Sequence, residues 1–127
     1  MTEVQLPDKQ HYYEQVWAQV RMIPSGIVAT YGQIAKLLPA PEGISDTEYQ
    51  AYGPRWAGLA MAACPEEVPW HRVVNSQGRL SHPTEAAMQK EILQAEGVLF
   101  FNEKIDLREF QWRGPGQSEH FTQGRLF

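Results

Sequence analysis

The chain has 127 residues, of which 43% are hydrophobic and 20% charged, and this composition suits one globular domain with a buried core. No apolar run reaches the ~18 residues of a membrane span, the start lacks the basic and apolar regions of a signal peptide, and the single Cys64 excludes an intrachain disulfide and a cysteine-cluster zinc site. The net charge of −4 argues mildly against nucleic acid, but segment 53–90 is nearly neutral, so charge leaves DNA binding open. We expect a cytoplasmic protein without membrane association.

The first two predicted helices follow from apolar spacing and from capping residues. Residues 9–23 place apolar side chains at helical spacing, and Pro24 ends that run. These side chains are Tyr13, Val16, Trp17, Val20 and Ile23. Thr30 and Gln33 form a T-x-x-Q capping box, which predicts a short helix over 31–38. Its expected buried face consists of Ile34, Ala35, Leu37 and Leu38.

The middle of the chain predicts two more short helices. Ser45 and Glu48 form a second capping box, which opens a turn or two of helix over 46–51. Gly53 is expected to interrupt this helix, and Pro54 suits the first position of a fresh helix that continues to about residue 63. The fresh helix carries Arg55, Ala57, Gly58 and Ala60. Two short helices separated by a turn indicate a helix-turn-helix arrangement, with a connection longer than the usual tight turn.

The C-terminal half predicts a hairpin and another helix. Val73–Val74 and Arg79–Leu80 flank Asn-Ser-Gln-Gly, a pattern typical of a small β-hairpin. Thr84 is expected to cap a helix that runs through Glu96, with Gly97 beyond its end. The apolar face of this helix is expected to be Met88, Ile92 and Ala95.

The remaining segments carry weaker patterns. Residues 98–112 are expected to form a final strand pair, or a strand and a turn. Residues 1–116 are expected to form a single domain, and residues 117–127 a mobile tail. The four histidines are scattered without the spacing of metal ligands, so neither a metal site nor a cofactor is predicted.

The segment Pro-Trp-His-Arg-Val-Val (69–74) has the look of a prepared chemical site, yet Trp70 stands where a nucleophile would be expected. Each residue alone has a structural explanation. A histidine beside a tryptophan, such as His71, is most often structural. A lone cysteine such as Cys64 is usually a small buried hydrophobe. Single residues therefore do not establish a function.

Several blocks in order are more specific than any one residue. IPSGIVATYGQIAKLL (23–38), GPRWAGLAMAACP (53–65), PWHRVV (69–74) and ILQAEG (92–97) together resemble the DNA-binding domain of the O6-alkylguanine-DNA alkyltransferases. In that family the third block reads Pro-Cys-His-Arg, and the cysteine thiolate removes an alkyl group from a flipped guanine. With Trp70 at the cysteine position, the chain is similar to the alkyltransferase-like proteins, which bind alkylguanine lesions without repairing them directly. The resemblance implies an α/β, mostly α fold, a winged helix-turn-helix domain with a small β wing.

The resemblance also implies roles for individual residues. Arg55 matches an arginine finger that enters the duplex in place of the flipped base, and Tyr31 matches a tyrosine that rotates the phosphate and promotes flipping. A solvated arginine and a core aromatic are the structural alternatives. The residues expected to contact DNA are Tyr31, Arg55, Trp56, Ala57, Gly58 and Ala60. The small ones would let a recognition helix approach the minor groove, or would instead serve tight core packing.

The expected lesion pocket consists of Tyr31, Trp70, His71, Arg72, Glu96 and Ser81. His71 and Glu96 match the pair that activates the enzymes' cysteine through a water, and without a thiol they are expected to remain as scaffolding. Trp70 would offer its indole to the extruded base, because base–aromatic stacking is worth ~1–3 kcal/mol. The loop 81–84 lacks the glycine- and tyrosine-containing sequence that lines the enzyme pocket, so a more open wall that accepts larger alkyl groups is hypothesised.

The resulting prediction is a monomeric, non-enzymatic protein that binds O6-alkylguanine in double-stranded DNA by nucleotide flipping. By resemblance alone, its partners would be nucleotide excision repair proteins such as UvrA, and in a bacterium it would be associated with the nucleoid. Two alternatives stay open. One is an active alkyltransferase that uses Cys64, and the other is a winged-helix regulator without lesion specificity.

Overall fold

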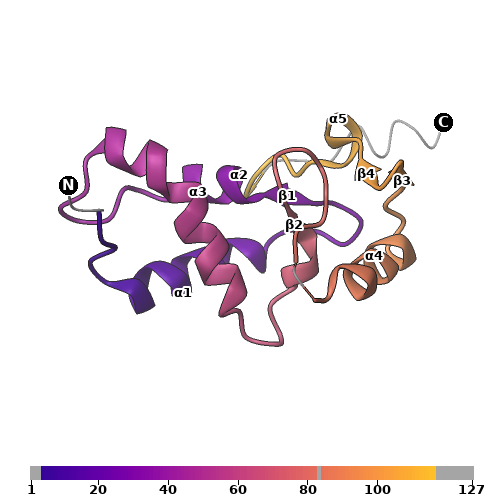
Figure 1. The fold of residues 1–127 in the computed structure, drawn as a ribbon, viewed down its shortest axis with the longest axis horizontal. Helices are drawn as coiled ribbons and strands as arrows, with labels where there is room; N and C mark the ends of the chain where they lie inside the picture. The colour runs from indigo at the N-terminus through magenta and orange to yellow at the C-terminus, as the bar shows by residue number, and fades with distance from the viewer. Residues whose placement is uncertain (1–3, 83, 117–127) are drawn as a thin grey trace.

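The computed structural model describes residues 4–82 and 84–116. Its elements are α1 (Lys9–Val20), β1 (Ala29–Thr30), α2 (Tyr31–Lys36), α3 (Asp46–Ala62), a 3₁₀ turn (Trp70–Arg72), β2 (Val73–Val74), α4 (Ala86–Ala95), β3 (Phe100–Phe101), β4 (Lys104–Ile105) and α5 (Leu107–Phe110). In Figure 1, α1, α2 and α3 gather toward one end, and α4, α5 and the β3–β4 hairpin form the other. The short β1–β2 pair lies between the two groups.

The two N-terminal helices confirm most of the pattern predicted for them. α1 spans Lys9–Val20 and so ends before the predicted residue 23, and the Asp8 side chain accepts a hydrogen bond from the His11 backbone at its start. The predicted apolar side chains are all buried, including Ile23 beyond the helix end. The capping box before α2 is present, since Thr30 Oγ1 accepts from the Gln33 backbone at 3.1 Å. The predicted burial of Leu37 is wrong, because α2 ends at Lys36 and Leu37 turns outward at the helix end.

The prediction of two helices around Gly53 and Pro54 is wrong, because α3 runs without interruption from Asp46 to Ala62. Pro54 removes the backbone donor that would bond to the Gln50 carbonyl, and both residues lie on the exposed side, where water can replace the bond. Gly53 is buried instead of marking a break, and a Cβ there would lie 3.1 Å from the Tyr49 ring and 3.2 Å from the Ala35 methyl. This glycine therefore lets α3 pack closely against α2.

An aromatic cluster fills the core between α1, α2 and α3. The Tyr12 and Tyr49 hydroxyls lie 2.8 Å apart, and Tyr49 donates to the Ala35 carbonyl at 2.7 Å. Trp56 packs against Tyr12, Tyr49 and, in a stacked arrangement, Tyr52. Burial raises the pKa of both Tyr12 and Tyr49, so the hydroxyls stay protonated and bridge the three helices.

The hairpin predicted for residues 73–80 is wrong in its pairing. β2 pairs in parallel with β1, which places Ala29 opposite Val73 and Thr30 opposite Val74. Both valines are buried, and a parallel pair covered on both faces accommodates them better than an exposed hairpin. The turn after β2 does form, with Gly78 donating to the Asn75 carbonyl at 3.0 Å and Asn75 to the Arg79 carbonyl at 3.1 Å, but Arg79–Leu80 form no strand paired with β2.

Of the two arrangements expected for residues 98–112, the strand pair is present: β3 and β4 pair antiparallel, with Phe100 opposite Ile105. Asn102 and Glu103 form its turn with φ values of 53° and 62°, as expected of a two-residue hairpin loop. Gly78 packs on this hairpin and accepts a backbone hydrogen bond from Ile105 at 2.9 Å. A Cβ at Gly78 would lie 2.3 Å from the Ile105 carbonyl oxygen, so only glycine fits there.

The helix predicted to begin at Thr84 begins instead at Ala86, and the Thr84 side chain does not cap it. Its predicted apolar face is also wrong: Met88 and Ala95 are exposed, whereas Gln89 and Leu93 are buried. The predicted end is confirmed, since Gly97 has a φ of 101° and the Val98 backbone donates to the Leu93 carbonyl.

No helix within the described ranges is long and apolar enough to cross a membrane. The domain boundary at residue 116 stays a prediction, and the predicted tail, 117–127, lies outside the described residues.

Candidate functional site

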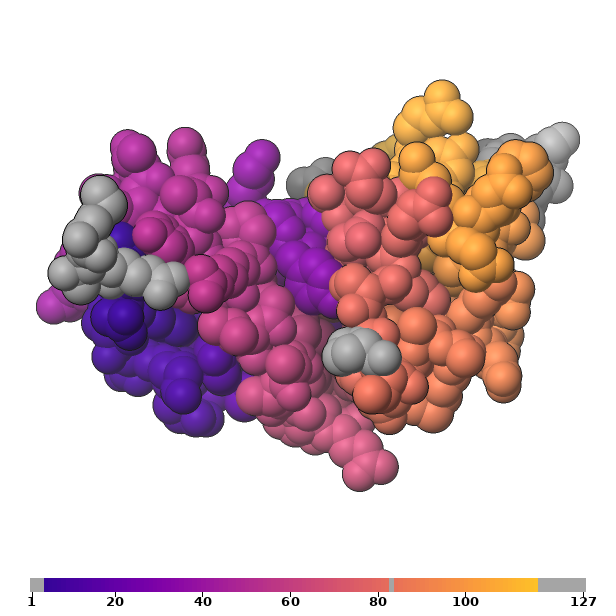
Figure 2. Space-filling model, in the orientation of Figure 1, coloured from indigo at the N-terminus to yellow at the C-terminus, as the bar shows by residue number. Residues whose placement is uncertain are grey.

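A cleft of about 440 Å³ lies between the C-terminal half of α3 and the segment that follows β2. It is lined by Tyr31, Gly58, Met61, Ala62, Trp70, Val73, Ser81, His82 and Gln89. In Figure 2 the near face is hollowed between the pink surface of α3 and the salmon surface that follows β2, with the purple surface around α2 set back between them. Tyr31, Trp70 and Ser81, three of the residues predicted for a lesion pocket, therefore meet here.

Trp70 is half-buried at the start of the 3₁₀ turn, in the lining of the cleft. Its ring lies edge-on to His71, with centroids 6.2 Å apart, and tilts against His82 at 5.5 Å. The buried Gln89 amide donates to the His71 carbonyl at 2.9 Å and to the Val73 carbonyl at 3.2 Å, which fixes the turn from below. The turn thus holds an indole in the cleft, and an indole has no atom suited to attack an alkyl group.

A carboxylate-centred network supports the turn. Glu96 Oε2 lies 2.8 Å from His71 Nε2 and accepts from Arg72 Nη2 at 2.8 Å. Its other oxygen accepts from Arg72 Nε and from the Gly26 backbone, each at 3.1 Å. Arg72 also donates to the Ile23 carbonyl at 2.9 Å. The network joins the 3₁₀ turn, the end of α4 and the loop between α1 and β1.

The position of Glu96 determines its charge state. Burial raises its pKa, but hydrogen bonds from Arg72, His71 and the Gly26 backbone outweigh burial and hold the pKa at about 2. The carboxylate is therefore ionised at neutral pH and fully engaged. His71, Arg72 and Glu96 were predicted as pocket residues, but they do not line the cleft. They lie behind Trp70 and fix its backbone.

Two hydroxyl groups face each other at the edge of the cleft. Tyr31 begins α2, where the Thr30 capping box fixes the helix start, and its hydroxyl lies 3.5 Å from Ser81 Oγ. Ser81 is exposed, so the pair is open to solvent. The structure thus brings these two residues of the predicted lesion pocket together, and both hydroxyls can donate or accept hydrogen bonds.

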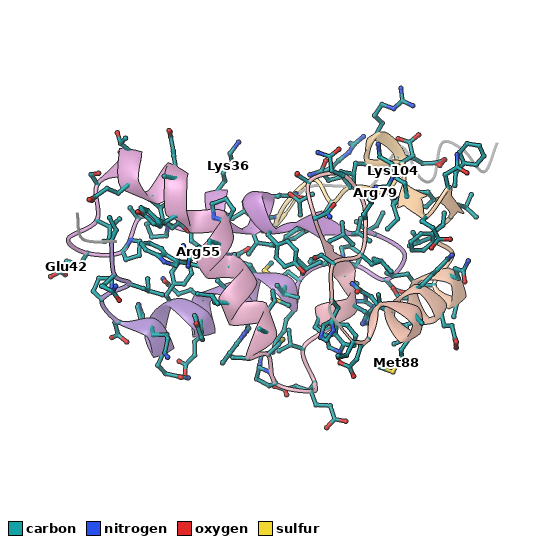
Figure 3. The ribbon with its side chains drawn as sticks, in the orientation of Figure 1. Lys36, Glu42, Arg55, Arg79, Met88 and Lys104 are labelled. Atoms are coloured by element: carbon teal, nitrogen blue, oxygen red, sulfur yellow. The ribbon has the colours of Figure 1, made fainter. Side chains whose placement is uncertain are left out.

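α3 separates the residues predicted to contact DNA into two groups. Trp56, Ala57 and Ala60 are buried against the other helices, so the structure places these three residues, predicted to contact DNA, in the core. Arg55, labelled on α3 in Figure 3, is exposed and does not line the cleft, whereas Gly58, one turn later, lines it. A Cβ on Gly58 would meet no neighbour within 4 Å, so the glycine leaves open surface there.

Sequence reasoning missed five residues that line the cleft: Met61, Ala62, Val73, His82 and Gln89. Met61 follows from its place on α3 one turn after Gly58. Gln89 carries little signal, because a polar residue within a helix is expected on the exposed face. His82 stands in a loop next to a helix start, where serine, threonine, aspartate or asparagine is the usual signal.

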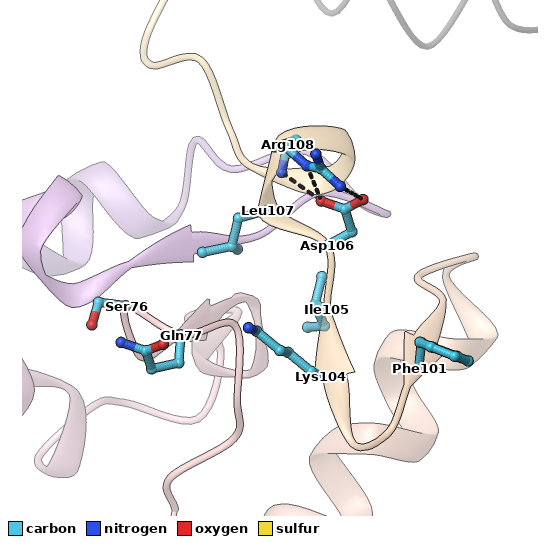
Figure 4. Close-up of a pocket in the computed structure, with 8 residues that line it drawn as sticks. All are labelled: Ser76, Gln77, Phe101, Lys104, Ile105, Asp106, Leu107 and Arg108. Carbon is cyan, nitrogen blue, oxygen red and sulfur yellow. Dashed lines mark hydrogen bonds and ion pairs between the residues drawn. The ribbon is translucent and has the colours of Figure 1, made fainter.

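A second hollow of about 450 Å³ lies between the turn after β2 and the β4–α5 segment (Figure 4). Ser76, Gln77, Lys104 and Leu107 are among its lining residues, and Asp106 pairs with Arg108 at its edge. The residues predicted to bind DNA or a lesion do not line it.

Cys64 lies after the end of α3 and is half-buried against the core of α1–α3. Burial raises the pKa of its thiol to about 11, with Arg21 opposing and Glu67 adding to the shift. A thiol in this state is protonated at neutral pH and therefore a poor nucleophile. Cys64 also does not line the cleft that holds Trp70.

Comparison with known proteins agrees with this geometry. Residues 11–98 match the family described as 6-O-methylguanine DNA methyltransferase, DNA binding domain. A DNA base-flipping protein of Vibrio parahaemolyticus is 38% identical over 103 residues, covering 78% of this chain and 93% of the relative. Alkyltransferase-like protein 1 of Schizosaccharomyces pombe is 36% identical over 112 residues, covering 80% of this chain and 94% of the relative. The chain belongs to the alkyltransferase-like proteins.

The solved structures support the same family. S. pombe Atl1 in complex with damaged DNA containing O6-carboxymethylguanine has a TM-score of 0.66 and 34% identity, over 82% of this chain and 96% of that chain. The mostly helical, helix-turn-helix fold class predicted from the sequence is confirmed, although the two helices expected on either side of Gly53 are the single helix α3. In this alkyltransferase-like protein, Gly58 of α3 and the indole of Trp70 line the same cleft.

Proposed function

We propose that the protein recognises O6-alkylguanine in double-stranded DNA by flipping the nucleotide into the cleft, and that it transfers no alkyl group. One observation carries the proposal: the cleft presents Trp70, at the position where the related enzymes have their acceptor cysteine, and Cys64 lies outside it. The DNA complex of the S. pombe relative supports the same partner for this chain.

Flipping has a cost that the cleft is suited to offset. Extruding a nucleotide costs ~a few kcal/mol, and stacking the base on an indole returns ~1–3 kcal/mol. Gln89 and the Glu96 network hold the 3₁₀ turn, and with it Trp70, in place. Binding a flipped base therefore costs little further conformational entropy of the protein. The Tyr31 and Ser81 hydroxyls supply polar partners at the edge of the cleft.

The exposed face of α3 is the proposed DNA contact. The small residues Gly58 and Ala62 leave little side-chain volume on this face of α3 beside the cleft, so the helix can approach a DNA groove closely. Arg55 stands one turn before Gly58, and its guanidinium can enter the space that the flipped nucleotide leaves.

The absence of transfer rests on the chemistry of the groups present. His71 and Glu96 would activate a thiol in a related enzyme, but here Glu96 is engaged by Arg72, His71 and Gly26. The lesion would therefore stay in the DNA. Another activity must remove it, and we propose nucleotide excision repair proteins such as UvrA as the partners that take over the complex.

Binding and transfer measured on the same duplexes test this function. Calorimetric titration with matched guanine and O6-methylguanine duplexes should show tighter binding to the lesion, and a radiolabelled methyl group should remain in the DNA after the protein is denatured. Trp70→Ala should lose about 1–3 kcal/mol of lesion binding while its affinity for undamaged DNA changes little.

Phe101→Ala is the matched control, since Phe101 is an exposed aromatic residue outside the cleft. Equal affinity for the two duplexes would favour a regulator without lesion specificity. Label that stays on the protein, and that Cys64→Ser abolishes, would establish a transferase instead.

A further inference from the structure

His82 forms the wall of the cleft beside Trp70. Its ring centroid lies 5.5 Å from that of Trp70, with 52° between the planes, and one third of its side chain is exposed. Both rings line the cleft, together with Ser81. The wall that sequence comparison suggested to be open is therefore occupied by an imidazole.

Both nitrogens of this imidazole are held. Nδ1 accepts hydrogen bonds from the backbone N–H groups of Thr84 at 3.3 Å and Glu85 at 3.1 Å. Nε2 lies 3.5 Å from the Glu85 carboxylate. A ring fixed at two edges cannot easily swing aside when a ligand enters.

The same contacts explain how α4 begins without a conventional cap. Glu85 occupies the N-cap position, and its side chain makes no capping hydrogen bond. The imidazole accepts from the backbone N–H of the N-cap residue Glu85, which has no partner within the helix, and from that of Thr84 just before it. His82 therefore has two separable features: an acceptor atom that orders the helix start, and a ring that occupies space beside Trp70.

We propose that His82 determines which O6-alkyl groups the cleft accepts, by narrowing it against Trp70 and excluding bulky groups in favour of small ones. This inference rests on the proposed lesion recognition. The ring volume performs the selection, and the hydrogen bonds from Thr84 and Glu85 keep the ring in position.

Two variants separate the ring from the acceptor. His82→Asn retains an oxygen that can accept from the helix start, as asparagine does at helix N-termini, but removes the ring. His82→Phe retains ring volume without an acceptor. We expect His82→Asn to unfold at the wild-type temperature and to gain affinity for a benzyl lesion relative to a methyl lesion by about tenfold, the scale of added space in an apolar pocket. His82→Phe should keep the wild-type preference and unfold at a lower temperature.

The experiment is calorimetric titration with guanine, O6-methylguanine and O6-benzylguanine duplexes, with His11→Asn as a control at an exposed histidine of α1. Affinity for the guanine duplex should stay within about twofold in every variant. An unchanged benzyl-to-methyl ratio in His82→Asn, or an equal shift in His82→Phe, would overturn the role of His82 while leaving lesion recognition intact. A wild-type protein that does not distinguish lesion from guanine would instead remove the proposed function, and this inference with it.

Discussion

Arg72 and Glu96 form a two-point ion pair behind the cleft, with Nε 3.1 Å from Oε1 and Nη2 2.8 Å from Oε2. The pair connects the 3₁₀ turn that carries Trp70 to the C-terminal end of α4, and Arg72 continues to the Ile23 carbonyl. The position of the indole thus depends on an interaction that does not line the cleft. Stability and recognition are therefore linked in this part of the molecule.

Arg72→Met should lower the free energy of unfolding by about 2–4 kcal/mol, because it leaves a shielded carboxylate without its main partner. The two side chains are only 17% and 14% exposed. Urea unfolding measures the loss. Glu103→Gln is the control, since it removes the partner of Lys90 from a far more exposed pair and should cost less than about 1 kcal/mol. Equal losses in the two variants would contradict the importance of the Arg72–Glu96 pair.

The network should also make part of the stability sensitive to acid. The folded pKa of Glu96 is about 2, below its ordinary value of 4.5. A lowered folded pKa stabilises the native state above the unfolded pKa, and that contribution is lost as the pH falls from 4.5 toward about 2. Wild type should exceed Glu96→Gln by roughly 2–3 kcal/mol at neutral pH, and the gap should close by pH 2. Thermal unfolding of both proteins across this pH range measures the difference in stability. A difference that does not change with pH would refute the prediction.

Gly53→Ala should destabilise the protein by about 1–3 kcal/mol, because the added methyl would crowd the Tyr49 ring and the Ala35 methyl. Helix propensity alone would predict the opposite effect on stability, since it favours alanine over glycine by ~1 kcal/mol. Gly58→Ala on the same helix has open space and should be neutral or stabilising. Chemical denaturation of both variants tests the pair, and a Gly53→Ala protein as stable as Gly58→Ala would show that α2 and α3 are not tightly packed.

Tyr49→Phe should cost about 1–3 kcal/mol, since it leaves the buried Tyr12 hydroxyl and the Ala35 carbonyl without their partner. Tyr52→Phe removes a hydroxyl from the stacked and less buried neighbour in the same aromatic cluster, and should cost well under 1 kcal/mol. Guanidinium unfolding curves for the two variants give the comparison. Similar midpoints would mean that the hydroxyl bridge contributes little.

Tyr31→Phe should weaken lesion binding by about 1 kcal/mol with little change in stability, because its hydroxyl lies at the edge of the cleft and makes only a long contact with Ser81. Ser81→Ala tests the other hydroxyl in the same way. Titration with lesion and undamaged duplexes, accompanied by thermal unfolding, separates the two effects. A loss of stability without a loss of lesion affinity would assign Tyr31 a purely structural role.

Sequence patterns predicted those parts of the fold that depend on neighbouring residues. The two capping boxes, Thr30–Gln33 and Ser45–Glu48, are present because each needs only four consecutive residues. The glycine that ends α4 follows from the same local logic. The break at Gly53 was wrong because its backbone is governed by contact with α2, which no local pattern reveals.

The residues of the cleft likewise fall into those that sequence patterns predicted and those that depend on contacts between distant segments. Trp70, Tyr31 and Ser81 were found because the spaced blocks of sequence resemble a family, and they do meet in one cleft. His82 was missed because its role arises from a loop that folds back on Trp70. The parallel pairing of β1 with β2 also joins segments far apart in the chain, so a local turn signal favoured the wrong partner.

The distribution of the four tryptophans has a practical consequence for spectroscopy. Trp17, Trp56 and Trp112 are at most 9% exposed, whereas Trp70 is only half-buried in the cleft. A soluble quencher such as iodide should therefore reach the emission of Trp70 ahead of the other three. A base stacked on that indole would both lower its fluorescence and shield it from the quencher. The protein therefore carries its own fluorescent reporter at the point where a flipped nucleotide would arrive.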